Sequence, residues 1–233
     1  SRDIELPEPA DVLVAEVIGN EPFEEEVLET TLDARRRLLK PDARLIPYAL
    51  ELVARPLLIP DEDARQRAIG PKAIQRWRTL YGIDFEPLLD AAFPGPVNNP
   101  TEADVLARWP PVGPPVTVAT VELGCYERPI LDASAELTVA NTAWVNAIAI
   151  TFRAYLHGSL AHTLDPWRWP SSSWATSVWV LPDPVRVGSR DTLRVRYCRR
   201  VPGRADGLTC ELSPFLGDAA TVPTGMMEVA RFR

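Results

Sequence analysis

The feature that most constrains the fold is a change in hydrophobic pattern. One strand–helix–strand unit is followed by a long region in which apolar and polar residues alternate. In that region Leu193, Val195 and Tyr197 alternate with polar or charged neighbours, a period of two that is typical of a half-buried strand. Roughly seven such strands, separated by Pro, Gly, Asp and Asn, predict an antiparallel sandwich or barrel. The other six predicted strands are residues 116–123, 133–140, 143–156, 174–181, 208–212 and 226–232.

Four arginines lie in or just after the strand around Val195, namely Arg194, Arg196, Arg199 and Arg200. Because arginine is rarely buried unless it is paired, we interpret them as a solvated strand face. An anionic partner for this face is the alternative.

The strand–helix–strand unit lies near the start of the chain. Residues 11–15 form an apolar run that ends at Glu16, which suits a buried parallel strand. Residues 25–40 then have one apolar face, glutamates in the first turn and basic residues in the last, as the helix dipole favours. Pro41 is predicted to end this helix, and residues 44–59 to be extended.

A single crossover unit cannot form a doubly wound sheet, because that architecture needs several parallel strands covered on both faces. Two explanations are open: the strands add to another chain, or the sequence is the C-terminal part of a longer polypeptide. We favour the second.

Helical periodicity returns after residue 70. Ile74, Trp77 and Tyr81 lie on one face of a predicted helix. A shorter helix is predicted at 86–93, and the Pro-, Gly- and Asn-rich stretch at 94–115 is predicted to be an irregular connection.

Composition excludes several classes of function. The net charge of −7 argues against a nucleic-acid partner bound through a broad basic face. Cys125, Cys198 and Cys210 form no CxxC pair, which predicts reduced thiols in a cytoplasmic protein. His157 and His162 have no further ligand beside them, so we predict no metal site. No apolar run approaches the ~20 residues that a membrane-spanning helix needs.

Acidic residues gather between the first strand and the first helix. Glu16 ends the strand, and Glu24, Glu25 and Glu26 follow a Gly-containing turn. Carboxylates held on such a turn form a pocket for a planar cation, of which a guanidinium is the obvious example. The simpler alternative is that residues 24–26 are first-turn glutamates favoured by the helix dipole.

These residues resemble the double-glutamate loop of the protein arginine methyltransferases. In that family a second glutamate follows nine residues after the first. Here Glu25 follows Glu16 by nine, with Gly19 between them. Two further segments match the family in order. Residues 75–84 resemble its Trp…Tyr-Gly-Phe-Asp segment in the helical dimerisation arm, and residues 172–174 resemble the Thr-His-Trp loop of its C-terminal β-barrel.

The resemblance implies roles for particular residues. Glu16 and Glu25 would be the catalytic pair that clamps the substrate guanidinium, and Val27 and Thr30 would lie near the adenosyl part of S-adenosylmethionine. A homodimer through the arm is also implied, as is an arginine-containing protein or peptide as substrate. The implied substrate-pocket residues are Ile18, Gly19, Asn20, Ser173 and Trp174, and the implied dimer contacts are Trp77 and Tyr81.

The sequence departs from the family in four places. The loop between the two glutamates is charged where the family is aromatic and apolar, Ile18 replaces a methionine, and Ser173 replaces a histidine. No GxGxxG motif or equivalent occurs in the 233 residues. We therefore expect the chain as given to bind S-adenosylmethionine poorly and to be inactive alone.

We predict an α+β fold. Residues 1–48 would be the C-terminal, strand–helix–strand portion of a Rossmann-like methyltransferase domain. Residues 49–233 would be an antiparallel β-barrel for substrate binding and dimerisation, with an inserted helical arm at about 69–112. The predicted function is that of the C-terminal portion of an S-adenosylmethionine-dependent methyltransferase acting on a guanidinium. The alternative is a non-catalytic β-barrel and dimerisation scaffold or a degenerate methyltransferase relative.

Overall fold

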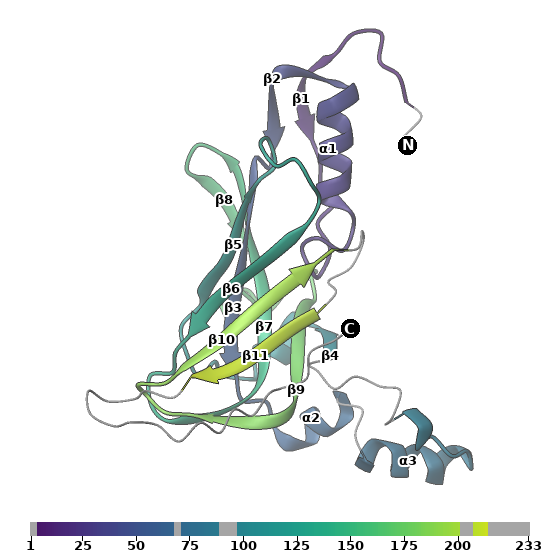
Figure 1. The fold of residues 1–233 in the computed structure, drawn as a ribbon, viewed down its shortest axis with the longest axis vertical. Helices are drawn as coiled ribbons and strands as arrows, with labels where there is room; N and C mark the ends of the chain where they lie inside the picture. The colour runs from purple at the N-terminus through teal and green to yellow at the C-terminus, as the bar shows by residue number, and fades with distance from the viewer. Residues whose placement is uncertain (1–3, 68–70, 89–96, 201–206, 214–233) are drawn as a thin grey trace.

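The computed structural model describes residues 4–67, 71–88, 97–200 and 207–213. Figure 1 shows a small strand–helix–strand unit at the upper end, antiparallel strands below it, and short helices at the lower end. The fold is mostly antiparallel sheet with few helices, as the α+β prediction expects.

The N-terminal unit contains β1 (Ala10–Val14), α1 (Val27–Arg37) and β2 (Leu39–Ile46). β1 pairs with β2 in parallel, which confirms the predicted crossover. The prediction that β1 is buried is wrong for the described structure: the exposed fractions of Val12 and Val14 are 47% and 72%. Among the described residues β1 has only β2 beside it, so its other edge and much of its surface face solvent.

Helix α1 ends before the position that the sequence predicted. The backbone N–H of Leu38 donates to the carbonyl of Ala34 at 2.8 Å, and β2 begins at the next residue. Pro41 therefore lies inside β2 and does not terminate the helix. Proline is tolerated in this strand because β2 is hydrogen-bonded to β1 along one edge only.

The larger sheet has six antiparallel strands. They are ordered β4-β9-β7-β3-β5, with β8 paired to β7. β7 is the central strand and is buried continuously from Val145 to Phe152, because it has neighbours on both edges and covered faces. The strands are β3 (Ala49–Leu57), β4 (Val97–Thr101), β5 (Val116–Glu122), β7 (Ala143–His157), β8 (Leu160–Thr163) and β9 (Thr176–Val187).

The smaller sheet has the order β11-β10-β6, with β6 (Leu131–Leu137), β10 (Thr192–Arg199) and β11 (Gly207–Ser213). The predicted alternation in β10 is confirmed, since Leu193, Val195 and Tyr197 are buried. Outward-facing Arg194 and Arg196 pair with acidic residues of β6. Buried residues of both sheets share one core, which the apolar face of α1 also joins. A second buried cluster combines residues of β3, β7 and β9 with α5.

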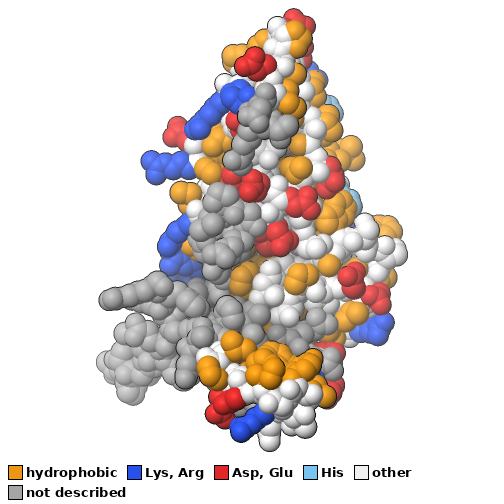
Figure 2. Space-filling view, turned by 90° about the vertical axis from the view of Figure 1, so that its right-hand side faces the viewer, with side chains coloured by type: hydrophobic (Ala, Val, Ile, Leu, Met, Phe, Trp, Pro, Cys, Tyr) orange, Lys and Arg blue, Asp and Glu red, His pale blue; other side chains and the backbone are white. Residues whose placement is uncertain are grey.

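The observed helices agree only in part with those predicted from the sequence. α2 (Asp61–Arg67) precedes α3 (Pro71–Tyr81), and Gly82 ends α3 with a φ of 67°. The stretch predicted to be irregular, 94–115, instead contains β4 and α5 (Ala103–Leu106). Hydrophobic side chains gather near the lower end of the face in Figure 2, at the height of α2 and α3.

Several predictions lie wholly or partly outside the described residues. They are the strand at 226–232, residues 89–93 of the second helix, residues 94–96 of the connection, residues 69–70 and 89–96 of the helical arm, and residues 201–206 and 214–233 of the barrel.

Candidate functional site

The candidate site is the loop that joins β1 to α1. The N–H of Ala15 donates to the carbonyl of Ile46 at 3.0 Å and so extends the β1–β2 pairing by one residue. Glu16 follows directly and its side chain is exposed. Glu25, just before α1, is exposed as well. The structure therefore places both predicted carboxylates at the surface of one loop, where a cationic ligand can reach them.

The loop turns tightly at Gly19. The N–H of Glu24 donates to the carbonyl of Glu21 at 2.9 Å. A Cβ on Gly19 would lie 3.0 Å from the Glu21 carbonyl oxygen and 3.0 Å from the Glu24 Cβ. A side chain at this position would require these neighbours to move by a few tenths of an ångström. Glu26 then enters α1 with a φ of 60°, the only positive φ of a non-glycine residue in the described part of the chain.

The loop is bound to the segment before β9. The indole N–H of Trp174 donates to the carbonyl of Ile18 at 3.0 Å, and the N–H of Ala175 donates to Oδ1 of Asn20 at 3.0 Å. Trp174 is held edge-on to Phe152, with ring centroids 5.8 Å apart. Three predicted pocket residues, Ile18, Asn20 and Trp174, are thus brought together.

Their side chains serve different purposes. Ile18 is only 5% exposed, so it contributes its carbonyl to this contact and its side chain to the core. Asn20 and Trp174 are half-buried at the contact itself. Ser173 is exposed beside Trp174. No hydrogen bond from Ser173 to the glutamate loop is found among the described residues.

The two predicted cofactor residues, Val27 and Thr30, lie on different faces of α1. Val27 is completely buried in the core, because it lies on the inner face of α1. Its side chain therefore faces the core, and a position of Val27 beside the cofactor stays a prediction. Thr30 lies on the exposed face of the same helix and remains accessible.

The sequence analysis missed a buried polar cluster beneath the loop. Glu21 is only 3% exposed and accepts a hydrogen bond from the Tyr197 hydroxyl. Burial raises the pKa of the Glu21 carboxyl from 4.5 to about 7, although the Tyr197 hydrogen bond and the charge of Arg199 act in the opposite direction. Its second oxygen, Oε2, has no hydrogen-bond partner among the described residues.

Arg199 is fully buried beside this cluster, which corrects its interpretation as part of a solvated face. Its guanidinium forms two parallel hydrogen bonds with the carboxylate of Glu29 on α1, at 3.0 and 2.9 Å. It also donates to the carbonyls of Phe23, at 3.2 Å, and Pro129, at 2.8 Å. A signal was present in the sequence, because Arg199 continues the buried phase of Val195 and Tyr197.

Neither a metal-binding cluster nor a membrane-spanning helix is found in the part of the chain that the structure describes. Within the described ranges, no group of three or more His, Cys, Asp and Glu side chains is placed to hold a metal ion. Among the helices that the structure describes, none is both long and apolar enough to span a bilayer.

No family model matches the sequence. Curated relatives, in contrast, match the sequence. The chain is 28% identical over 199 residues to the probable histone-arginine methyltransferase 1.4 of Arabidopsis thaliana, covering 80% of the chain and 35% of the relative. It is 27% identical over 126 residues to the probable protein arginine N-methyltransferase 6 of the same plant, covering 52% of the chain and 27% of the relative. It is 37% identical over 90 residues to protein arginine N-methyltransferase 1 of Schizosaccharomyces pombe, covering 37% and 24%.

Solved structures share the fold. The Trypanosoma brucei PRMT1 enzyme-prozyme heterotetrameric complex with AdoHcy matches with a TM-score of 0.70 at 18% identity, over 94% of this chain and 68% of that one. Arabidopsis thaliana protein arginine methyltransferase 10 matches with the same TM-score and identity, over 94% and 70%.

The described elements therefore define a chain with the fold of an arginine methyltransferase. The chain is similar, at low identity, to members of the protein arginine methyltransferase family and shares their fold. It spans roughly a third or less of the length of the first curated relatives, at 27% and 35%.

Proposed function

We propose that the chain is the C-terminal portion of an S-adenosylmethionine-dependent enzyme that methylates the guanidinium of an arginine-containing protein or peptide. The observation that carries the proposal is the glutamate loop. Glu16 and Glu25 keep the family spacing, both are exposed, and the loop between them is held by Trp174. Such a loop offers carboxylates in a fixed arrangement to a planar cation.

The chemistry that these residues would perform is positioning. Two carboxylates orient a guanidinium through charge-assisted hydrogen bonds and concentrate electron density on the nitrogen that attacks. A fixed orientation also removes much of the entropic part of the barrier. S-adenosylmethionine, when bound, supplies the sulfonium methyl group that is transferred.

The chain offers only part of a surface for that cofactor. Thr30 is exposed on α1 and is placed to contact the adenosyl part, whereas the side chain of Val27 is buried. The 233 residues contain no Gly-rich strand–turn–helix motif. We infer that most of the cofactor wall comes from residues outside this sequence, and that residues 1–48 are the end of the domain that contains it.

The proposal includes a homodimer through the helical arm, at about 69–112. The rings of Trp77 and Tyr81 each pack edge-to-face against the ring of Phe85, with centroids 5.7 and 6.2 Å apart. Leu80 and Ile83 beside them are 66% and 56% exposed. An aromatic cluster flanked by exposed apolar side chains is typical of a protein interface.

A non-catalytic scaffold is the second candidate function. One observation favours it: polar residues of the loop are engaged in holding the fold, since Asn20 binds the N–H of Ala175 and Glu21 binds Tyr197. These positions are aromatic or apolar in the family that the loop resembles.

Methyl transfer by the complete encoded polypeptide separates the two candidates. The polypeptide is incubated with radiolabelled S-adenosylmethionine and either an arginine-rich peptide or its lysine-substituted counterpart. We expect label in the arginine peptide only, recovered as methylarginine after hydrolysis. No transfer, together with a dimer in analytical ultracentrifugation, would support the scaffold instead.

A further inference from the structure

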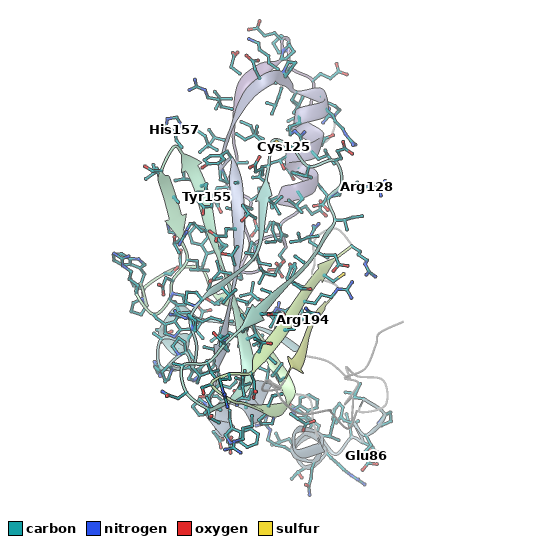
Figure 3. All side chains as sticks on the ribbon, turned by 60° about the vertical axis from the view of Figure 1, so that its left-hand side comes forward. Glu86, Cys125, Arg128, Tyr155, His157 and Arg194 are labelled. Carbon is teal, nitrogen blue, oxygen red and sulfur yellow. The ribbon has the colours of Figure 1, made fainter. Side chains whose placement is uncertain are left out.

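A basic hollow lies at the end of α1 that is remote from the glutamate loop. It has a volume of about 590 Å³ and lies between the last turns of α1, the start of β2 and the loop after β5. This volume falls in the range of about 300–1,000 Å³ that is usual for small-molecule sites. Figure 3 shows Arg128, which lines the hollow, beside α1.

The lining of this hollow is strongly positive. Arg35, Arg36, Lys40 and Arg128 contribute four cations, and Glu127 contributes the one acidic side chain. The whole protein, in contrast, carries a net charge of −7. A concave cluster of one sign on a molecule of the opposite sign focuses the electrostatic field and attracts anions locally.

The helix dipole explains only part of this cluster. Basic residues in the last turn of a helix stabilise its C-terminus, which accounts for Arg35 and Arg36. Lys40 lies on β2 and Arg128 on the loop after β5, so neither belongs to that turn. The fold therefore brings cations from three elements to one hollow.

The walls of the hollow are fixed before any ligand arrives. The Arg35 guanidinium donates to the carbonyl of Tyr126 at 2.8 Å and lies 5.5 Å from the centre of its ring. The Tyr126 hydroxyl is hydrogen-bonded to Thr31 and to the carbonyl of Leu28. A preformed site loses less conformational entropy when it binds a ligand.

Two of the four cations are uncommitted. Arg36 and Arg128 are exposed, and within the described ranges neither forms an ion pair with an acidic side chain. Lys40 is held by Asp11 at 2.7 Å, which lies outside the lining. Arg36 and Arg128 are therefore available to a ligand.

We propose that this hollow binds a diphosphate group. Guanidinium groups pair with phosphate oxygens through parallel hydrogen bonds, and several cations around one hollow match more than one anionic group. Leu32, Leu39 and Leu45 also line the hollow. Apolar surface beside the cations can accommodate an organic part attached to the diphosphate, as in a nucleoside diphosphate. The site is independent of the proposed methyl transfer.

Isothermal titration calorimetry of the 233-residue chain at low ionic strength tests the proposal. The probes are inorganic pyrophosphate, adenosine diphosphate and inorganic phosphate. We expect saturable binding of at least one diphosphate probe, and affinity for phosphate lower by about tenfold or more, because one anionic group is lost. Tighter binding of pyrophosphate or of adenosine diphosphate identifies the source of the group. No saturable binding of either diphosphate probe, or equal affinity for phosphate, would overturn the proposal.

A pair of double variants checks the location. Arg36→Gln with Arg128→Gln should weaken binding of the diphosphate probe by about tenfold or more, because two uncommitted guanidinium groups are removed. The matched control is Arg108→Gln with Arg194→Gln, which removes the same charge from exposed residues outside the hollow. The control should stay within about twofold of the wild type, since screening limits distant charges. Equal losses in both double variants would show general attraction and contradict a site here.

Discussion

The indole N–H of Trp174 donates to the carbonyl oxygen of Ile18 at 3.0 Å, across 156 positions of sequence. This hydrogen bond joins the segment before β9 to the loop that carries Glu16 and Glu25. The geometry of the proposed guanidinium pocket therefore depends on the antiparallel sheets as well as on the N-terminal unit.

Removing that hydrogen bond should destabilise the fold. Trp174→Phe keeps an aromatic ring but leaves the Ile18 carbonyl without its donor. We expect the free energy of unfolding to fall by about 1–2 kcal/mol, measured by urea denaturation. Trp169→Phe is the control, since Trp169 is 56% exposed. Equal effects of the two substitutions would show that the contact contributes nothing.

Glu21 should make stability depend on pH. Its pKa in the folded state is about 7, against 4.5 for the ordinary carboxyl. Between pH 4.5 and about 7, the Glu21 carboxyl therefore holds a proton in the folded state that it has released in the unfolded state. The stabilisation is complete below pH 4.5 and is lost as the pH rises through 7. The groups that act on this carboxyl are Tyr197, Arg199 and Glu24.

Glu21→Gln should remove this dependence, because an amide stays neutral at all these pH values. We expect wild-type stability to fall by roughly 3 kcal/mol between pH 4 and pH 8 relative to the variant. Denaturant titrations at several pH values measure the difference. Exposed Glu8→Gln is the control and should leave the profile of the wild type unchanged. A parallel profile for Glu21→Gln and the wild type would contradict the assignment.

Arg199 should be among the most sensitive positions for stability. Arg199→Met leaves the carboxylate of Glu29 without its main partner in a site where that side chain is only 10% exposed. We expect a loss of about 3–5 kcal/mol in the free energy of unfolding. Arg194→Met breaks a surface pair with Glu136 and should cost no more than about 1 kcal/mol.

A second variant tests the reason for this loss. Adding Glu29→Gln to Arg199→Met should recover part of the stability, because no uncompensated charge then remains. A further loss equal to that of Glu29→Gln alone would show that the two side chains are not coupled.

Glu26 adopts a left-handed backbone conformation, which a residue with a Cβ adopts only at a cost. Glu26→Gly should therefore raise the free energy of unfolding by about 0.5–1 kcal/mol. Glu25→Gly, at a position without positive φ, should lower it instead. Thermal unfolding of the two variants measures the contrast, and destabilisation by both would exclude backbone strain at Glu26 as a significant effect.

Local pattern predicted the strands well where burial alternates. Leu193, Val195 and Tyr197 were placed correctly because one face of β10 is buried. The same period places Arg199 inside, but its charge suggested solvent, and its partner Glu29 is 170 positions away. β4 was missed because Asn98, Asn99 and Pro100 are poor strand formers; they are tolerated at the edge of the sheet.

The candidate site was predicted in its outline only. The spacing of Glu16 and Glu25 is visible in the sequence, whereas the burial of Val27 depends on which face of α1 meets the core. The contacts of Asn20 and Glu21 with the sheets depend on tertiary structure, and no local pattern carries them. The exposure of β1 depends on which strands lie beside it, which its own apolar run does not specify.

The central claim is that Glu16 and Glu25 act together on a guanidinium. Its most direct test is methyl transfer from radiolabelled S-adenosylmethionine to an arginine-rich peptide by the complete encoded polypeptide. Exposed Glu62→Gln is the control and should keep wild-type turnover. We predict that Glu16→Gln and Glu25→Gln each abolish transfer while circular dichroism and unfolding remain unchanged. Wild-type turnover in Glu16→Gln would contradict the catalytic assignment.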